Sequence, residues 1–127
     1  MTRLWLCLGA ANGFIAVALG AFAAHGLEGD AGARGWLETG ADYQLVHALA
    51  LLALAALSCR VEDAARRWLT VAGWSFLAGI VLFSGGLYLM ALAGIASLGP
   101  VVPMGGFAFF AGWAALFVAG WRYREDR

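Results

Sequence analysis

Two histidines and a few polar neighbours are the residues of this chain whose side chains could carry out chemistry. His25 follows the first apolar segment, and Asp42 and His47 lie near the start of the second. Two imidazoles and a carboxylate suit Zn²⁺ or Cu²⁺, and histidine also exchanges protons near neutral pH. If the two segments form adjacent antiparallel helices, these side chains meet at the outer end of the pair. The candidate ligand-binding set is His25, Asp42, Tyr43, Gln44 and His47.

Structural hydrogen bonding is the role that we favour for this set, with a metal site and a proton or ligand contact as alternatives. The chain has only two histidines, and His25 stands directly before Gly26. A glycine and a positive side chain at a helix end complement its unpaired carbonyl groups. No nucleophile is flanked by a base, and no loop is built to cradle a phosphate. We therefore predict no metal centre, no cofactor, no catalytic residue and no enzymatic activity.

The composition is that of an integral membrane protein. Of the 127 residues, 63% are hydrophobic and only 13% are charged, whereas about 25% are charged in soluble domains. The net charge is zero, which argues against nucleic acid as a partner, because such binding needs a basic surface. The principal expected partner is therefore the lipid bilayer.

Four apolar segments are long enough to cross a bilayer, because a helix rises about 1.5 Å per residue and the hydrocarbon core is about 30 Å thick. They predict an all-α integral membrane protein, a four-transmembrane-helix bundle that forms a single membrane domain over residues 1–127. The predicted membrane-spanning segments are residues 4–24, 40–59, 68–95 and 104–123, with an outer loop at residues 25–39.

Local signals set the ends of these segments. Thr39 and Asp42 have the spacing of a capping box, which favours a second helix that starts near residue 40. Residues 33–38, within the outer loop, could form a short interfacial helix. The third segment is longer than a bilayer requires, so we expect it to be tilted, or broken at residues 85–86. Pro103 suits the first position of the fourth helix, because proline lacks an N–H that would be unpaired there.

Arginine is distributed unevenly between the two sides of the predicted bundle. Arg34 alone lies on the side of the outer loop, and seven arginines lie on the other. Basic residues in short loops favour the cytoplasm, so both termini are predicted to be cytoplasmic. The absence of lysine and the abundance of alanine and glycine suggest a bacterial genome rich in G and C, hence a multi-pass protein of the inner membrane. The seven arginines are Arg3, Arg60, Arg66, Arg67, Arg122, Arg124 and Arg127.

Small residues and one amide predict how the helices pack. Glycines four residues apart in the first segment would let a neighbouring helix approach closely, and Asn12 between them could hydrogen bond across helices. Residues 84–86 with Tyr88 could instead form a binding site in a broken helix, and residues 105–106 could attract a phosphate headgroup. Close packing is the interpretation that we favour. The predicted helix-packing set is Gly9, Asn12, Gly13, Gly20, Gly85, Gly86, Gly105 and Gly106.

Four motifs resemble one family of small bacterial membrane proteins. They are G-A-F-A-A-H-G-L at 20–27, W-L-E-T-G-A-D-Y-Q-L-V-H-A-L-A at 36–50, F-S-G-G-L-Y at 83–88 and L-G-P-V-V-P-M-G-G at 98–106. The family is that of domain of unknown function 423, related to the eukaryotic transmembrane protein 256. The resemblance implies a four-helix membrane bundle and brings no established activity. Gly86 and Val102 stand where the family motifs have Ser or Thr, which weakens a hydroxyl-based site. The family's recurring residues map onto His25, Gly26, Tyr43, Gln44, His47, Ser84, Gly85, Tyr88, Pro103, Gly105 and Gly106.

A protein made of four helices and one small outer loop suits a non-enzymatic accessory or scaffold subunit of a larger membrane protein complex. An oligomeric small transporter or channel is the first alternative. A lipid or hydrophobic-cofactor binding protein that uses glycine-lined grooves is the second. The expected protein contact is accordingly a membrane-protein partner or a homo-oligomer.

Overall fold

The computed structural model describes residues 1–123 as helices joined by short turns, with no strand in that range. The helices are α1 (Thr2–Gly26), α2 (Ala31–Ser58), α3 (Asp63–Gly79), a π-helical turn η1 (Ile80–Ser84), α4 (Gly85–Ala93), a 3₁₀ turn η2 (Ala96–Leu98) and α5 (Val101–Trp121). Since α3, η1 and α4 form one continuous rod, four helical segments are long and apolar enough to cross a membrane. The predicted all-α membrane bundle is confirmed. Arg124 and Arg127, two of the seven arginines above, lie outside the described residues.

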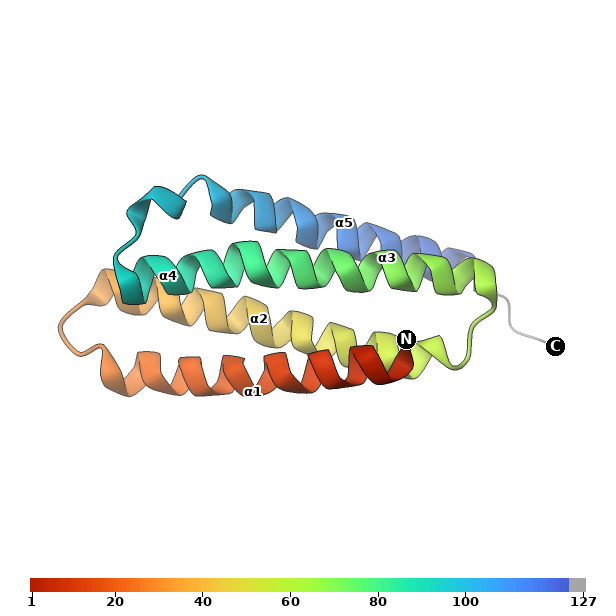
Figure 1. Ribbon diagram of the computed structural model, residues 1–127, viewed down its shortest axis with the longest axis horizontal. Helices are drawn as coiled ribbons and strands as arrows, with labels where there is room; N and C mark the ends of the chain where they lie inside the picture. Colours follow the sequence, from red (N-terminus) through yellow and green to blue (C-terminus); the bar gives the residue numbers. More distant parts are fainter. Residues whose placement is uncertain (124–127) are drawn as a thin grey trace.

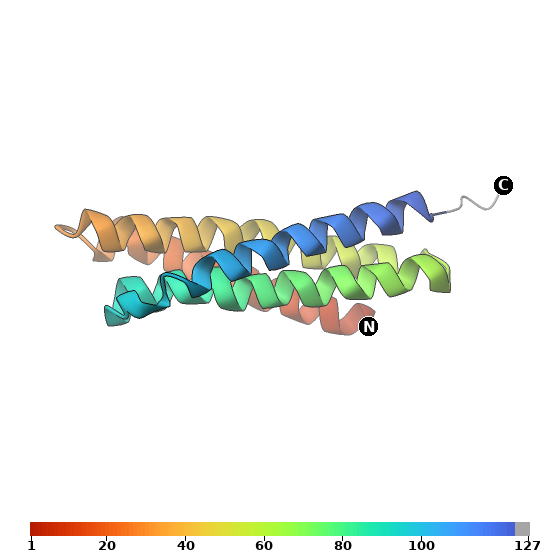
Figure 2. The same cartoon turned by 90° about the horizontal axis from the view of Figure 1, so that it is seen from above.

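The helices run side by side along the long axis of the molecule (Figure 1). The closest pairs are α1 with α2 and α3 with α5, and α2 joins the two pairs through its contacts with η1 and α4. Seen from above, α5 runs obliquely to α3 (Figure 2). The N-terminus, the α2–α3 turn and the end of α5 lie at one end of the bundle, and the α1–α2 and α4–α5 turns lie at the other.

The prediction of an outer loop at residues 25–39 is wrong, because only residues 27–30 connect α1 to α2. Gly29 turns the chain with a φ of 102°, and the Asp30 carboxylate caps α2 by accepting a 2.9 Å hydrogen bond from the Ala33 N–H. Asp30 therefore replaces the predicted cap at Thr39. The predicted interfacial helix at residues 33–38 forms the first turns of α2 instead, where an ion pair of 2.8 Å joins Arg34 to Glu38.

The third membrane-spanning rod is not broken at residues 85–86, although it is irregular immediately before them. In η1 the Gly85 N–H bonds to the Ile80 carbonyl five residues back, as in a π-helix. Gly94, with a φ of 67°, ends α4 in the left-handed conformation. Pro103 is the third residue of α5 rather than the first, a position whose N–H also has no partner within the helix.

Glycines packed against aromatic rings hold the two halves of the core together. Trp5 and Phe76 are fully buried. A Cβ at Gly73 would lie 2.6 Å from the Trp5 ring, so α1 and α3 meet there without space for a side chain. Gly79 packs against Phe109, and Gly112 packs against Phe76. These reciprocal contacts explain how α3 and α5 approach so closely.

Gly105 and Gly106 provide a matched test of this packing. A Cβ at Gly105 would collide with the backbone nitrogen of Phe83, whereas a Cβ at Gly106 would have nothing within 4 Å. We expect Gly105→Ala to lower the free energy of unfolding by about 1–3 kcal/mol, the usual cost of overpacking. We expect Gly106→Ala to raise it by about 0.4–1 kcal/mol, because alanine loses less backbone entropy than glycine on forming a helix. Unfolding in detergent with increasing SDS measures both, and equal stability of the two variants would contradict the packing described here.

Candidate functional site

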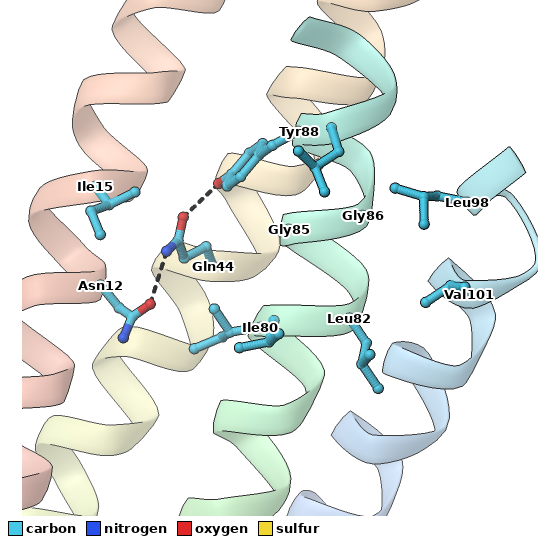
Figure 3. Close-up of a pocket in the computed structure, with 12 residues that line it drawn as sticks. Asn12, Ile15, Gln44, Ile80, Leu82, Gly85, Gly86, Tyr88, Leu98 and Val101 are labelled. Atoms are coloured by element: carbon cyan, nitrogen blue, oxygen red, sulfur yellow. Dashed lines mark hydrogen bonds between the residues drawn. The ribbon is translucent and has the colours of Figure 1, made fainter. Parts of the chain in front are cut away.

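A chain of hydrogen-bonded side chains links three helices near the middle of the bundle. The Tyr88 hydroxyl of α4 donates to Gln44 Oε1 of α2 at 2.6 Å, and Gln44 Nε2 donates to Asn12 Oδ1 of α1 at 2.8 Å (Figure 3). Asn12 Nδ2 in turn donates to the Leu8 carbonyl at 2.8 Å. We call Asn12, Gln44 and Tyr88 the polar relay.

The Leu8 carbonyl, the last acceptor of the polar relay, determines which atoms of the relay donate and which accept. The Leu8 carbonyl can only accept, so the amide nitrogen of Asn12 faces it and the Asn12 oxygen faces Gln44. The Gln44 oxygen is thereby left for the Tyr88 hydroxyl. The side-chain amide nitrogens of Asn12 and Gln44 each carry two hydrogens, and the hydrogen bonds above use one hydrogen of each. The relay thus retains two N–H donors, and the Tyr88 oxygen retains the capacity to accept.

The polar relay lies in the wall of an open groove with a volume of about 590 Å³. Gln44 is close to the midpoint of α2, so in a bilayer the relay lies within the hydrocarbon region. Gly85 and Gly86 of α4 add no side chains to the groove, which leaves room between α4 and the start of α5. The remaining lining residues are apolar: Ile15, Ile80, Val81, Leu82, Leu89, Leu98 and Val101.

His47 belongs to a separate aromatic cluster on another face of α2. Its Nδ1–H donates to the Tyr43 carbonyl at 2.7 Å, and its Nε2 accepts from the Trp113 indole N–H at 3.1 Å. The imidazole also stacks on Phe109 with 3.6 Å between ring centroids. Since Nε2 accepts, the ring is the neutral tautomer with hydrogen on Nδ1. Both nitrogens are therefore used: Nδ1 bonds within α2 and orients the ring, and Nε2 links α2 to α5.

The predicted ligand-binding set does not form one site. The contact of Gly13 with Ala48 sets the register of α1 against α2 and places His47 level with about residue 14. His25 lies in the last turn of α1, about 16 Å further along the helix at 1.5 Å per residue. The expectation that the two histidines approach each other is therefore wrong. In the described part of the chain, no three of the His, Cys, Asp and Glu side chains are grouped as a metal site would need.

The other members of that set are also dispersed. Gln44 is the member that lines the groove, while Tyr43 packs on Phe83 at 4.6 Å between ring centroids. Asp42 and His25 are exposed. The predicted set does not come together because α2 begins at Ala31 and not near residue 40, which places His47 near the centre of the helix and not at its outer end.

The predicted packing residues have different outcomes. Gly9, Gly13 and Gly20 face α2, and Gly86 and Gly105 contact Val102 and Phe83. Gly85 and Gly106 have no close neighbour across the bundle, so they do not serve as packing contacts. Asn12 hydrogen bonds between helices and also lines the groove.

The hydrogen bonds of Asn12 and Tyr88 with Gln44 were not predicted from the sequence. One signal was present, because Asn12 is the only asparagine of the chain and Gln44 its only glutamine, and both stand in apolar segments. Single amides in transmembrane helices tend to bond to one another, since hydrocarbon offers no other partner. Tyr88 carried no such signal, because only the tertiary fold brings its hydroxyl to Gln44.

Comparisons with known proteins give relatives over nearly the whole chain. A model of the family described as "Protein of unknown function (DUF423)" matches residues 19–106. The UPF0382 membrane protein YwdK of Bacillus subtilis is 43% identical over 95% of this chain and 98% of its own length. The UPF0382 inner membrane protein YgdD of Escherichia coli K12 is 44% identical over 98% of this chain and 94% of its own length. No solved structure matches the chain.

The two histidines should respond differently to substitution. His47→Ala removes two hydrogen bonds and leaves a void between Phe109 and Trp113, so we expect the free energy of unfolding to fall by about 2–4 kcal/mol. His25→Ala removes an exposed side chain and should change it by less than about 0.5 kcal/mol. SDS-driven unfolding compares the two variants. A similar loss for both would contradict the structural role assigned to His47.

Proposed function

Because this chain belongs to the DUF423 family of membrane proteins, whose activity is not known, we propose a function from the groove: the protein binds an uncharged, lipid-soluble molecule that carries a hydrogen bond acceptor. The chain is a multi-pass protein of the bacterial inner membrane. The observation that carries the proposal is the polar relay, whose remaining donors lie in the wall of an otherwise apolar groove.

The position of the donors defines the polar part of the ligand. A free N–H in hydrocarbon lacks the hydrogen bond that water would give it, at a cost of about 1–3 kcal/mol per group. A ligand with a carbonyl or ether oxygen removes that cost, whereas an acyl chain does not. No charged side chain lines the groove in the described part of the molecule, so it does not favour an ion. The expected polar group is a neutral acceptor.

The walls define the rest of the ligand. Aliphatic side chains from α1, η1, α4, η2 and α5 surround the relay, and they suit a hydrocarbon tail or a substituted ring. A volume of about 590 Å³ falls within the range of small-molecule sites. Because the groove is open and not enclosed, a ligand dissolved in the bilayer can enter sideways, without passing through water.

Binding, and not catalysis, is the activity that this chemistry supports. Amide and phenol groups hold and orient a ligand, and among the described residues no carboxylate, thiol or imidazole lines the groove. A role as accessory or scaffold subunit, with a membrane-protein partner or in a homo-oligomer, stays a prediction from composition. It is compatible with ligand binding, since such a subunit could present its ligand to a neighbour.

The ligand itself provides the test. Protein purified in mild detergent from native membranes should carry a neutral lipid-soluble molecule, detected by mass spectrometry of an organic extract. Gln44→Leu removes the centre of the relay and should lower retention by about tenfold, as loss of roughly 1.4 kcal/mol implies. Gly85→Leu places a side chain in the groove but removes no hydrogen-bonding group of the relay. It should lower retention of the ligand by a similar factor.

Two variants control for general loss of stability. Ser58→Ala removes another buried polar group of α2, whose Oγ donates to the Leu54 carbonyl at 2.6 Å outside the groove. Gly120→Leu adds a side chain where nothing lies within 4 Å. Both should retain the ligand. Folded wild-type protein that carries no such molecule, or groove variants that retain it at the wild-type level, would refute the proposal.

We also propose that both termini are cytoplasmic. Among the described residues, Arg3, Arg60, Arg66, Arg67 and Arg122 lie toward one end of the bundle and Arg34 toward the other, a distribution that supports this orientation.

Reporter fusions test the orientation. Green fluorescent protein fused to the C-terminus should fluoresce in Escherichia coli, and alkaline phosphatase at the same position should be inactive, because each requires its own compartment. Alkaline phosphatase inserted after Gly29, in the α1–α2 turn, should be active. The reverse pattern would contradict the proposed orientation.

A further inference from the structure

At the end of the bundle that holds the N-terminus, two arginines and a tryptophan surround a cavity of about 360 Å³. Arg67 and Trp68 come from the second turn of α3, and Arg122 directly follows α5. Ala64 and Val71 complete the lining. Because residues 64, 67, 68 and 71 follow helical spacing, one face of α3 forms most of the cavity. We call this site the arginine cradle, and it is separate from the groove.

Trp68 orients one of the two guanidinium groups. The Cζ atom of Arg122 lies 5.8 Å from the centroid of the Trp68 ring, within the range of a cation–π interaction. This contact holds Arg122 over the aromatic wall while Arg67 lies on the same face of α3. The two guanidinium groups therefore lie beside the same cavity. Their mutual repulsion is unfavourable there unless an anion binds between them.

The charges of the arginine cradle are not used by the ion pairs of the described chain. Those pairs are Arg34 with Glu38 and Arg66 with Asp63. The Arg66 guanidinium also donates a hydrogen bond to the Val61 carbonyl at 3.0 Å. Glu62 does not line the cradle but lines an adjoining cavity, to which Ala64 and Arg122 also belong.

The chemistry of the cradle fits one class of ligand. Guanidinium groups bind phosphate oxygens through paired, charge-assisted hydrogen bonds. The indole and the aliphatic side chains beside them suit the glycerol and first methylene groups of a lipid. Tryptophan and arginine near helix ends also lie where the headgroups of a bilayer lie. We propose that the arginine cradle binds the phosphate group of an anionic phospholipid.

Native mass spectrometry of the full-length protein tests this assignment. Protein mixed with phosphatidylglycerol should retain it in preference to phosphatidylcholine. The double variant Arg67→Gln with Arg122→Gln should lose about tenfold or more in retention, since each arginine near a membrane surface contributes about 1 kcal/mol to anionic lipid binding. Trp68→Leu keeps the apolar wall and should lose only about twofold to fivefold, the range of a cation–π contact.

The matched control is Arg3→Gln with Arg60→Gln. This variant removes an equal number of positive charges at the same end of the bundle, from exposed residues that do not line the cradle. It should retain phosphatidylglycerol to within about twofold. Equal losses in the two double variants would overturn the proposal, because they would assign the preference to overall charge. Melting temperatures show whether each variant folds. If the double variant Arg67→Gln with Arg122→Gln does not fold, the expected loss of retention in Trp68→Leu tests the proposal instead.

A second arm separates a lipid from a free anion. In nanodiscs of phosphatidylcholine, millimolar inorganic phosphate should leave the melting temperature unchanged, whereas phosphatidylglycerol should raise it. Stabilisation by inorganic phosphate that depends on Arg67 and equals that by phosphatidylglycerol would overturn the lipid assignment. The result is independent of the groove, since neither arm alters Asn12, Gln44 or Tyr88.

Discussion

The hydrogen bond from Asn12 to the Leu8 carbonyl is the interaction on which the described site depends. A polar group in hydrocarbon has no water to bond to, so each amide must find a protein partner or a ligand. The Leu8 carbonyl fixes which way Asn12 faces, Asn12 fixes Gln44, and Gln44 makes Tyr88 a donor. One backbone acceptor in α1 thereby sets the chemistry of a groove formed with α2 and α4. The bonds at Gln44 also join α1, α2 and α4, so the chemistry of the groove and the packing of these helices share one cause.

Close helix contacts make the polar relay possible. A Cβ at Gly40 would lie 2.7 Å from the Tyr88 ring, so the absence of a side chain there lets the ring pack against α2 with its hydroxyl at Gln44. Gly9, with Leu52 at 2.7 Å from its would-be Cβ, brings α1 equally close to α2. Gly85 acts in the opposite sense, because it lines the groove without a side chain and leaves space unfilled there. Glycine in this bundle therefore has two uses, contact on one side and cavity on the other.

Much of the architecture follows from hydrophobicity alone, and much of the site does not. The four membrane-length helices were predictable because apolar runs of that length have few alternatives. The start of α2 was not, because the spacing of Thr39 and Asp42 indicated a cap near residue 40, whereas the buried positions Ala33 and Leu37 continue the helix back to its cap at Asp30. Asn12 and Gln44 could have been paired as the only side-chain amides of the chain. Tyr88 and the pairing of His47 with Trp113 depend on the crossing of α2 with α4 and α5, which local sequence does not encode.

The π-helical turn at Ile80–Ser84 lets one rod serve two partners. Before the turn, α3 packs mainly on α5, and after it, α4 packs mainly on α2. An extra residue in one turn rotates everything beyond it by about 100° relative to a regular α-helix. If residues 80–84 formed a regular α-helix with no extra residue in the turn, Tyr88 would rotate by about that angle away from Gln44, even if every contact of α3 survived. The orientation of Tyr88, and with it the chemistry of the groove, thus depends on one extra residue in a turn that supplies none of the relay's hydrogen-bonding groups.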